Sequence, residues 1–230
     1  MKSFKIFAMA AFLAVAMSAS AQTKTASSVG EGWSSVYVQW NPSSVDIKKD
    51  SYSITGLSLG YNQAFKILSD QPLYVEGGLA AQFSFRSEDT GQDSEVNMTM
   101  FSAKIPVNLT YMFNLPNSSV AIAPYVGLTL RANLFGSQKT TLGDKDMDNL
   151  KSHGYTDDDI DEYEESLNLF DDNDMGQDAV WKRFQLGWQI GANVFFASKY
   201  YAGISYGTDM SEIFKKAKIS TTSITLGYCF

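Results

Sequence analysis

The chain has 230 residues, 44% of them hydrophobic, a formal net charge of −7 and a single cysteine, Cys229. One cysteine excludes an intramolecular disulfide, and the negative charge disfavours nucleic acid as a partner, because phosphates are bound by cationic side chains. The charge is local: fourteen acidic residues and only two lysines lie between positions 144 and 178.

The first 21 residues have the pattern of a secretory signal peptide. Lys2 and Lys5 precede an apolar run over 6–17, and Ala19-Ser20-Ala21 matches a small-residue cleavage site. No later apolar run reaches the roughly 18 residues that a transmembrane helix needs. We therefore expect residues 22–230 to form one exported β-domain, which either stays soluble or crosses a membrane as a barrel.

Apolar residues alternate with small or polar ones through most of this domain, which is typical of strands. The pattern is clearest over 184–196. It predicts eight strands, near 33–40, 51–65, 72–86, 95–113, 119–135, 181–196, 199–208 and 218–230. The alternation breaks near Gly56 and near Met100–Phe101, which indicates bulges or strand ends that extend beyond a membrane.

The predicted connections alternate in length, as expected when both ends of a barrel chain lie on one side of a membrane. The short ones are 66–71, 114–118 and 197–198; the longer ones are 41–50, 87–94, 136–180 and 209–217. Outward aromatic residues gather at both ends of the strands, as they do at the two interfaces of a bilayer. One group is Tyr61, Phe65, Tyr111, Phe113, Phe196, Tyr200, Tyr228 and Phe230; the other is Trp40, Phe83, Phe85, Phe101, Phe184 and Tyr206.

The last strand alternates Ile224, Leu226, Tyr228 and Phe230 with small or polar residues. Together with the signal peptide and the eight strands, this makes the chain resemble the OmpA/OmpX-like outer-membrane β-barrel domain family, including its PorT-like relatives. The resemblance implies an all-β, eight-stranded antiparallel up-and-down transmembrane β-barrel in the bacterial outer membrane, with its termini in the periplasm.

The resemblance also implies partners. The barrel would contact outer-membrane lipid and lipopolysaccharide, and the barrel-assembly machinery would recognise the terminal strand through Tyr228 and Phe230. It implies little about activity, because this fold carries many functions.

If the apolar face meets lipid, the interior receives Glu76, Arg86, Lys104, Tyr125 and Arg131, together with several amides. Small eight-stranded barrels fill their interiors with side chains, so we expect no wide pore. Buried charges need partners, and we expect Glu76 to pair with Lys104 or Arg131. We favour a polar plug that stabilises the barrel over an ion gate or proton path.

The segment 136–180 is predicted to be a long, acidic, partly helical extracellular loop. Asp144, Asp146 and Asp148 have the spacing that begins a calcium-binding loop, which makes weak calcium binding a hypothesis beside the simpler one of a solvated acidic loop. No other cofactor is expected.

A helix is predicted to begin after Thr156, because a capping residue precedes three acids in the first turn. Its apolar side would present Ile160, Tyr163, Leu167 and Phe170. We favour packing of this side on the barrel rim over binding of an extracellular protein partner.

The leading functional hypothesis is an outer-membrane barrel with a structural or surface-interaction role. A lipid-modifying enzyme is a second hypothesis, for which His153, the only histidine, would have to act with Ser152 or a nearby aspartate. A soluble lipocalin-like carrier is a third. We expect no enzymatic activity.

Overall fold

The computed structural model describes residues 31–47, 50–89, 94–164, 166–170, 181–214 and 217–230. The expected signal peptide lies outside this part of the chain. Eight long antiparallel strands dominate it: β1 (Gly32–Ile47), β2 (Asp50–Lys66), β3 (Leu73–Asp89), β4 (Glu95–Tyr111), β6 (Val120–Thr141), β8 (Phe184–Phe196), β9 (Tyr200–Asp209) and β10 (Ala217–Cys229). The short elements are β5 (Phe113–Asn114), α2 (Asp144–Ser152), α3 (Asp157–Tyr163) and β7 (Leu167–Asn168).

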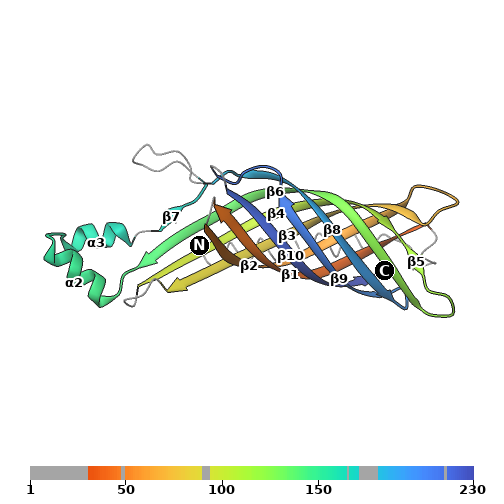
Figure 1. Cartoon of the computed structure of the whole chain (residues 1–230), viewed down its shortest axis with the longest axis horizontal. Helices are drawn as coiled ribbons and strands as arrows, with labels where there is room; N and C mark the ends of the chain where they lie inside the picture. Colours follow the sequence, from red (N-terminus) through yellow and green to blue (C-terminus); the bar gives the residue numbers. More distant parts are fainter. Residues whose placement is uncertain (1–30, 48–49, 90–93, 165, 171–180, 215–216) are drawn as a thin grey trace.

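The eight long strands close into a barrel (Figure 1). Each pairs with its neighbour in the chain, and β1 pairs with β10 to complete the ring. Because Ser35 at the start of β1 lies opposite Cys229 at the end of β10, the first and last strands begin and finish at the same end. We call this the terminal end, and the opposite end, which carries α2 and α3, the loop end. Closure removes every free sheet edge along the shared length of the strands.

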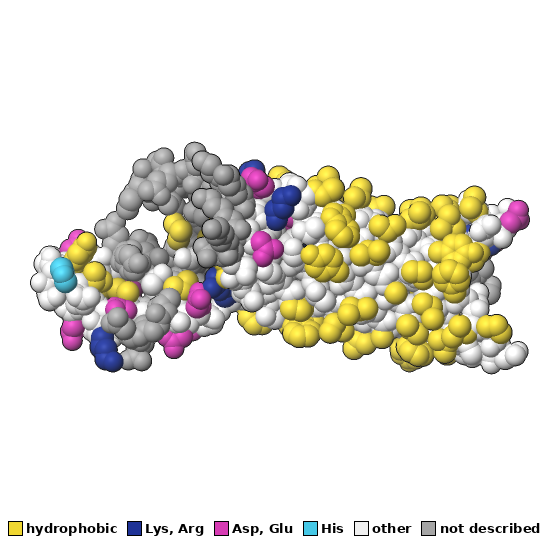
Figure 2. Space-filling view, in the orientation of Figure 1, with side chains coloured by type: hydrophobic (Ala, Val, Ile, Leu, Met, Phe, Trp, Pro, Cys, Tyr) yellow, Lys and Arg dark blue, Asp and Glu magenta, His cyan; other side chains and the backbone are white. Residues whose placement is uncertain are grey.

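The outer wall is apolar, as the alternating pattern predicts. Ile190, Leu226 and Val38 are each more than half exposed, and Figure 2 shows hydrophobic side chains spread over the barrel wall. Exposed aromatic side chains lie near both ends of the wall. Those near the terminal end include Phe65, Phe113, Phe196, Tyr200 and Tyr228; those toward the loop end include Trp40, Phe83, Phe85, Phe184 and Tyr206. The predicted aromatic belts are therefore present on the surface.

The strands are longer at the loop end than the sequence pattern indicates. β1 continues to Ile47 and β2 begins at Asp50, so the expected long connection over 41–50 is wrong. β6 continues to Thr141, six residues past its expected end at 135. In Figure 1, β3, β4 and β6 run on toward the helices, past the shorter β8, β9 and β10.

The two breaks in alternation have different causes. Near Phe101 a bulge is present, but the extra residue is on the partner strand: Phe101 lies opposite Phe135 and Ser102 opposite Asn133, which leaves Leu134 unpaired. Near Gly56 the pairing with β1 and β3 continues without a shift. Side chains near Gly56 still alternate between the interior and the outer wall. Only the polarity of the inward-facing side chains changes, because the interior of the loop end is apolar.

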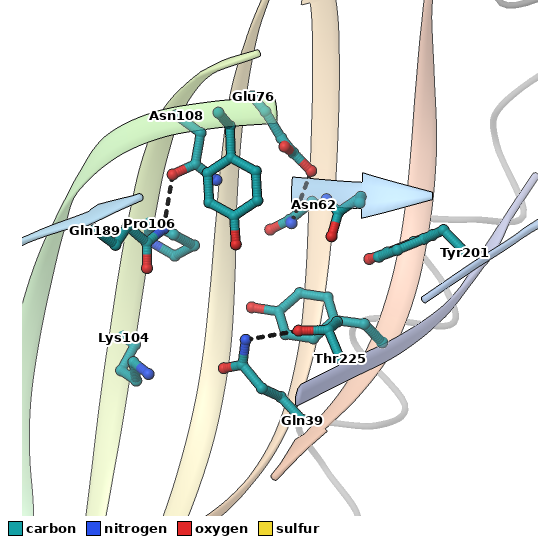
Figure 3. Close-up of a pocket in the computed structure, with 12 residues that line it drawn as sticks. Gln39, Asn62, Glu76, Lys104, Pro106, Asn108, Gln189, Tyr201 and Thr225 are labelled. Atoms are coloured by element: carbon teal, nitrogen blue, oxygen red, sulfur yellow. Dashed lines mark hydrogen bonds between the residues drawn. The ribbon is translucent and has the colours of Figure 1, made fainter. Parts of the chain in front are cut away.

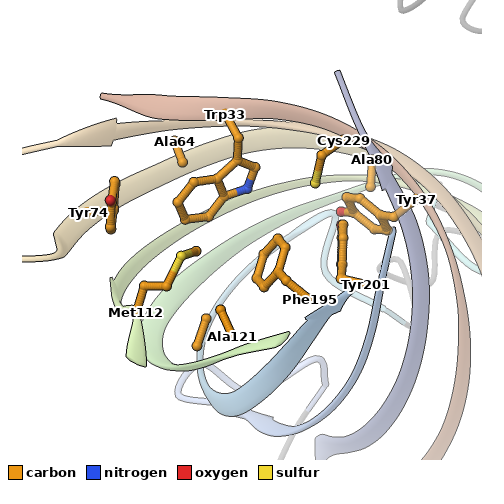
Figure 4. Close-up of a cluster of buried hydrophobic side chains, with 11 residues drawn as sticks. Trp33, Tyr37, Ala64, Tyr74, Ala80, Met112, Ala121, Phe195, Tyr201 and Cys229 are labelled. Carbon is orange, nitrogen blue, oxygen red and sulfur yellow. The ribbon is translucent and has the colours of Figure 1, made fainter. Parts of the chain in front are cut away.

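The interior has three layers along the barrel axis. At the terminal end a cluster of mostly aromatic and small side chains fills the lumen (Figure 4), in which Trp33 packs against Tyr74 at 4.9 Å and Phe195 at 5.4 Å between ring centroids. The middle layer is polar. The loop end holds a second cluster, which we call the outer cluster: Val45, Ile54, Met98, Met100, Leu169, Phe170, Trp181, Ile213, Ala217 and Ile219. The alternation pattern predicts a polar interior and misses both apolar layers.

The segment beyond β6 folds into two short helices and a return strand, which we call the head (residues 142–170). The expected cap is present: the Thr156 hydroxyl accepts from the Asp159 amide at 3.3 Å, and the Thr156 amide donates to the Asp159 carboxylate at 2.8 Å. The Thr156 hydroxyl also donates to the Asp159 carboxylate at 2.6 Å, and this bond, together with the one from the Thr156 amide, holds the pKa of Asp159 below its usual value.

The helix that follows this cap is shorter than predicted. It ends at Tyr163, and Leu167 lies in β7, which pairs with β6. Phe170 leaves the helix altogether and is 4% exposed in the outer cluster, where its ring meets Trp181. The predicted helix face that includes Leu167 and Phe170 is therefore wrong; Phe170 packs inside the barrel at the loop end, because burial of an aromatic ring is strongly favourable.

Candidate functional site

Glu76 is the first charged group of the polar layer. It projects inward from β3, is 3% exposed, and accepts hydrogen bonds from Asn62 Nδ2 at 2.9 Å and Thr110 Oγ1 at 3.4 Å. Among the described residues no cation forms a salt bridge with it, so the expected pairing with Lys104 or Arg131 is wrong. Neutral donors on the two adjacent strands satisfy this carboxylate instead.

Arg131 on β6 pairs with Asp209, whose carboxylate oxygen lies 3.4 Å from Arg131 Nη1. Both side chains are almost fully buried. Asp209 is not predicted from the sequence, because the alternation in β9 fades after residue 208 and the pattern places the aspartate in a loop. Lys104 on β4 lies directly opposite Arg131 in the strand register. Lys104 and Arg131 are therefore neighbouring cations, and Asp209 is the carboxylate that pairs with Arg131.

Of the other two residues of the expected interior network, only Tyr125 lies in the polar layer. Tyr125 on β6 is 9% exposed and lies in the polar layer. Arg86 lies outside that layer, near the loop end of β3, where its guanidinium sits 4.3 Å from the ring centroid of Tyr52 and pairs with Glu88. Arg86 faces inward, but β3 extends so far past the polar layer that Arg86 lies at the loop-end rim, beside Tyr52.

The polar layer encloses two small cavities of about 30 Å³ each. The first lies among Tyr37, Gln39, Asn62, Glu76, Lys104 and Asn108 (Figure 3). The second lies among Lys104, Thr129, Arg131, Ser205, Asp209 and Thr221. Each has room for about two water molecules. Apolar clusters close the lumen on both sides of them, so the described residues enclose no wide pore.

The three aspartates with calcium-loop spacing do not lie in a loop. Asp144, Asp146 and Asp148 belong to helix α2. Asp144 and Asp148, four positions apart, lie on one face of the helix, and Asp146 projects from the opposite face, so the three carboxylates do not converge. Asp146 accepts a hydrogen bond from Ser94. Within the described ranges, no group of three or more His, Cys, Asp or Glu side chains could hold a metal ion.

His153 is exposed at the C-terminus of α2. Its Nδ1 lies 2.8 Å from the carbonyl oxygen of Asn149, to which Ser152 Oγ also donates at 2.7 Å. Both side chains thus complete the hydrogen bonding of the helix end. Ser152 Oγ also lies 3.3 Å from His153 Nδ1, but each of the two side chains makes its shorter contact with the Asn149 carbonyl oxygen, which favours a capping role over a nucleophile and base.

The expected assembly residues lie together at the terminal end. Phe230 follows β10, and its amide donates to the carbonyl oxygen of Ser34 at 2.9 Å. Its ring lies 6.4 Å from that of Tyr228 and 6.3 Å from that of Tyr61. These rings form one aromatic patch on the outer wall, at the seam where the barrel closes. No described helix is long and apolar enough to cross a membrane.

Comparison with known proteins assigns this architecture. The family model described as outer membrane protein beta-barrel domain matches residues 7–230. Among solved structures, Ail of Yersinia pestis in complex with the heparin analogue sucrose octasulfate is 16% identical, with a TM-score of 0.45, over 87% of this chain and 99% of that one. Neisserial surface protein A is 12% identical, with a TM-score of 0.45, over 86% and 97%.

The outer-membrane enzyme PagL is 13% identical, with a TM-score of 0.37, over 82% of this chain and 97% of that one. No curated protein matches. The fold assignment rests on the strand pairing and the family match rather than on these distant structures. The family match, and not the strand count, contradicts the soluble lipocalin-like carrier, because the matched domain belongs to outer-membrane proteins.

Proposed function

The chain belongs to the outer membrane protein β-barrel domain family, and from this premise we propose that it is a non-transporting barrel that presents its acidic head to cationic partners. It is an integral outer-membrane protein. The observation that carries the proposal is the contrast between its two parts. The lumen is closed by packed side chains, whereas the head extends past the wall and carries exposed charge.

The head has the charge of a surface that attracts cations. Nine acidic residues and two lysines lie between 144 and 164, a net charge of 2 − 9 = −7. Asp148, Asp158 and Asp161 are exposed. One lysine is partly neutralised within the head, because Lys151 Nζ lies 2.7 Å from Asp157, and this contact raises the pKa of Lys151. Such a concentration of like charge accelerates encounter with cationic partners.

The orientation follows from the same contrast. The loop end carries the long head, and the terminal end carries short turns at 67–72 and 197–199. Outer-membrane barrels have short periplasmic turns and longer extracellular loops. We therefore place the termini in the periplasm and the head outside the cell. In this orientation the loop-end aromatic residues meet lipopolysaccharide, and the patch at Phe230 is presented to the assembly machinery.

The test measures binding of a fluorescent decalysine peptide to the purified full-length protein in nanodiscs. A variant with Asp148→Asn, Asp158→Asn and Asp161→Asn keeps the Lys151–Asp157 pair and the cap at Thr156. We expect its affinity to fall at least tenfold at low salt, and wild-type affinity to fall as salt increases. A control with Glu88→Gln and Glu95→Gln, outside the head, should bind like wild type.

Equal binding by the three-aspartate variant and the wild type would contradict the proposal. The orientation is tested separately with intact cells. Protease added outside should cleave within 142–166 and leave the terminal end intact. Cleavage only after the outer membrane is permeabilised would show that the head faces the periplasm.

A further inference from the structure

The second lumen cavity has a charge arrangement that the barrel fold does not require. Lys104 and Arg131 are direct cross-strand partners on β4 and β6, and each is 9% exposed. Their Cβ atoms are therefore about 5 Å apart, and like charges in that relation repel one another. Repulsion is strongest in an interior from which bulk water is excluded.

Protein groups compensate only one of these two charges. Asp209 is the carboxylate of this cavity, and its oxygen reaches Arg131 Nη1 at 3.4 Å, at the long end for an ion pair. Glu76 lines the first cavity, which Lys104 also lines, but Asn62 and Thr110 donate to Glu76 and no described cation forms a salt bridge with it. The second cavity is therefore bounded by two cations and one anion, a net charge of +1.

Hydrogen-bonding capacity is also unused at this cavity. Arg131 Nε and Thr129 Oγ1 are buried and have no hydrogen-bond partner among the described residues. Both residues line the cavity, as do Lys104 and the hydroxyl-bearing Thr221 and Ser223. A buried donor without a partner is unfavourable, and these two lie beside the excess positive charge.

We propose that the cavity among Lys104, Thr129, Arg131 and Asp209 binds one small monovalent inorganic anion, with chloride as the physiological ion. The negative charge offsets the excess positive charge, and the ion accepts from the ammonium group, the guanidinium Nε and the threonine hydroxyl. The volume of about 30 Å³ admits a halide but is too small for a sugar or a lipid headgroup. This site is separate from the head, so the anion-binding proposal can be tested independently of the surface-interaction proposal.

The direct test is a crystal of the refolded full-length protein grown in bromide, with data collected at the bromine absorption edge. One anomalous peak is expected in the lumen, within contact distance of Lys104 Nζ, Arg131 Nε and Thr129 Oγ1. A cavity that contains ordered water and gives no anomalous peak would overturn the proposal.

The solution test compares unfolding in bromide or chloride with unfolding in gluconate at equal ionic strength, since gluconate is too large for the cavity. A ligand bound only to the folded state lowers the unfolding equilibrium constant by the factor 1 + [L]/Kd, so about tenfold is expected when the halide is ninefold above its Kd. Equal stability in halide and gluconate would contradict the proposal.

Two variants locate the effect. Thr129→Val removes a hydroxyl that has no partner among the described residues, and it should abolish most of the halide dependence. The matched control Thr225→Val removes a hydroxyl from the first cavity, where Thr225 Oγ1 accepts from Gln39 Nε2 at 2.9 Å. This control should leave the halide dependence intact. Halide dependence that persists in Thr129→Val and in Lys104→Met would place the ion elsewhere and refute the assignment.

Discussion

Replacing Ile190 with arginine tests which surface of the barrel meets lipid, and how deeply. Ile190 is 53% exposed on the outer wall, midway along β8. Phe184 and Phe196, exposed aromatics at the two ends of that strand, each lie six positions away. Six residues at about 3.3 Å each, tilted by about 40–45°, rise roughly 14–15 Å. This is about half of an apolar band that is about 25 Å tall, so Ile190 lies near the midplane.

At that depth an arginine should destabilise the folded barrel by about 2–4 kcal/mol, whereas at the interface the cost falls to about 0–1 kcal/mol. The measurement is urea unfolding of Ile190→Arg in phosphatidylcholine bilayers, followed by tryptophan fluorescence. Phe184→Arg, at the belt, is the matched control for depth. The reasoning is refuted if the two variants lose equal stability, or if a hydrophobic photoprobe labels inward-facing Gln189 in preference to Ile190.

Four further predictions follow from the head, the outer cluster and the terminal patch. Replacing 143–165 with a short Gly/Ser turn should leave the barrel heat-modifiable on gels, because closing a shorter loop costs little entropy; replacing 138–178 should destabilise it, because Phe170 is lost from the outer cluster. Phe170→Ala alone should cost about 3–5 kcal/mol in bilayer unfolding, and a loss below 1 kcal/mol would show that the ring is not packed. Deleting Phe230 should impair insertion in cells but not refolding in vitro; normal surface accumulation would count against its role in assembly. Because the pKa of Asp159 is lowered in the folded head, its contribution is present above the unfolded value of about 3.9 and is lost as pH falls through the folded value. The protection of α3 amides relative to their intrinsic exchange rates should therefore fall at acid pH, and Thr156→Ala should raise the pKa of Asp159 in an NMR titration; an unchanged pKa would contradict the cap.

The wall of the barrel could be predicted from the sequence because a strand shows its two faces as a period of two. Ile190 and Gln189 differ in polarity since one meets lipid and the other the lumen, and the eight segments with this alternation all became strands. The head cap was predictable for the same local reason: Thr156 and Asp159 are three residues apart, within reach of one helical turn.

The lumen partners depended on the closed ring, which is not local. Arg131 and Asp209 are 78 positions apart, and only the pairing of β6, β8 and β9 brings them together. The outer cluster was missed because alternation records polarity and not depth. At Ile54 the inner face turns apolar, and the sequence alone shows this as a break in the pattern.

The class of fold, the direction that most wall residues face and the capped start of α3 could be derived from the chain alone, because each depends on neighbours within a few positions. The remaining features required the folded barrel. It set how far the strands run past the membrane, it buried Phe170 in the lumen, and it left Lys104 and Arg131 side by side with one carboxylate. These features arise when strands distant in the chain share one narrow interior, where volume and charge must balance across the ring.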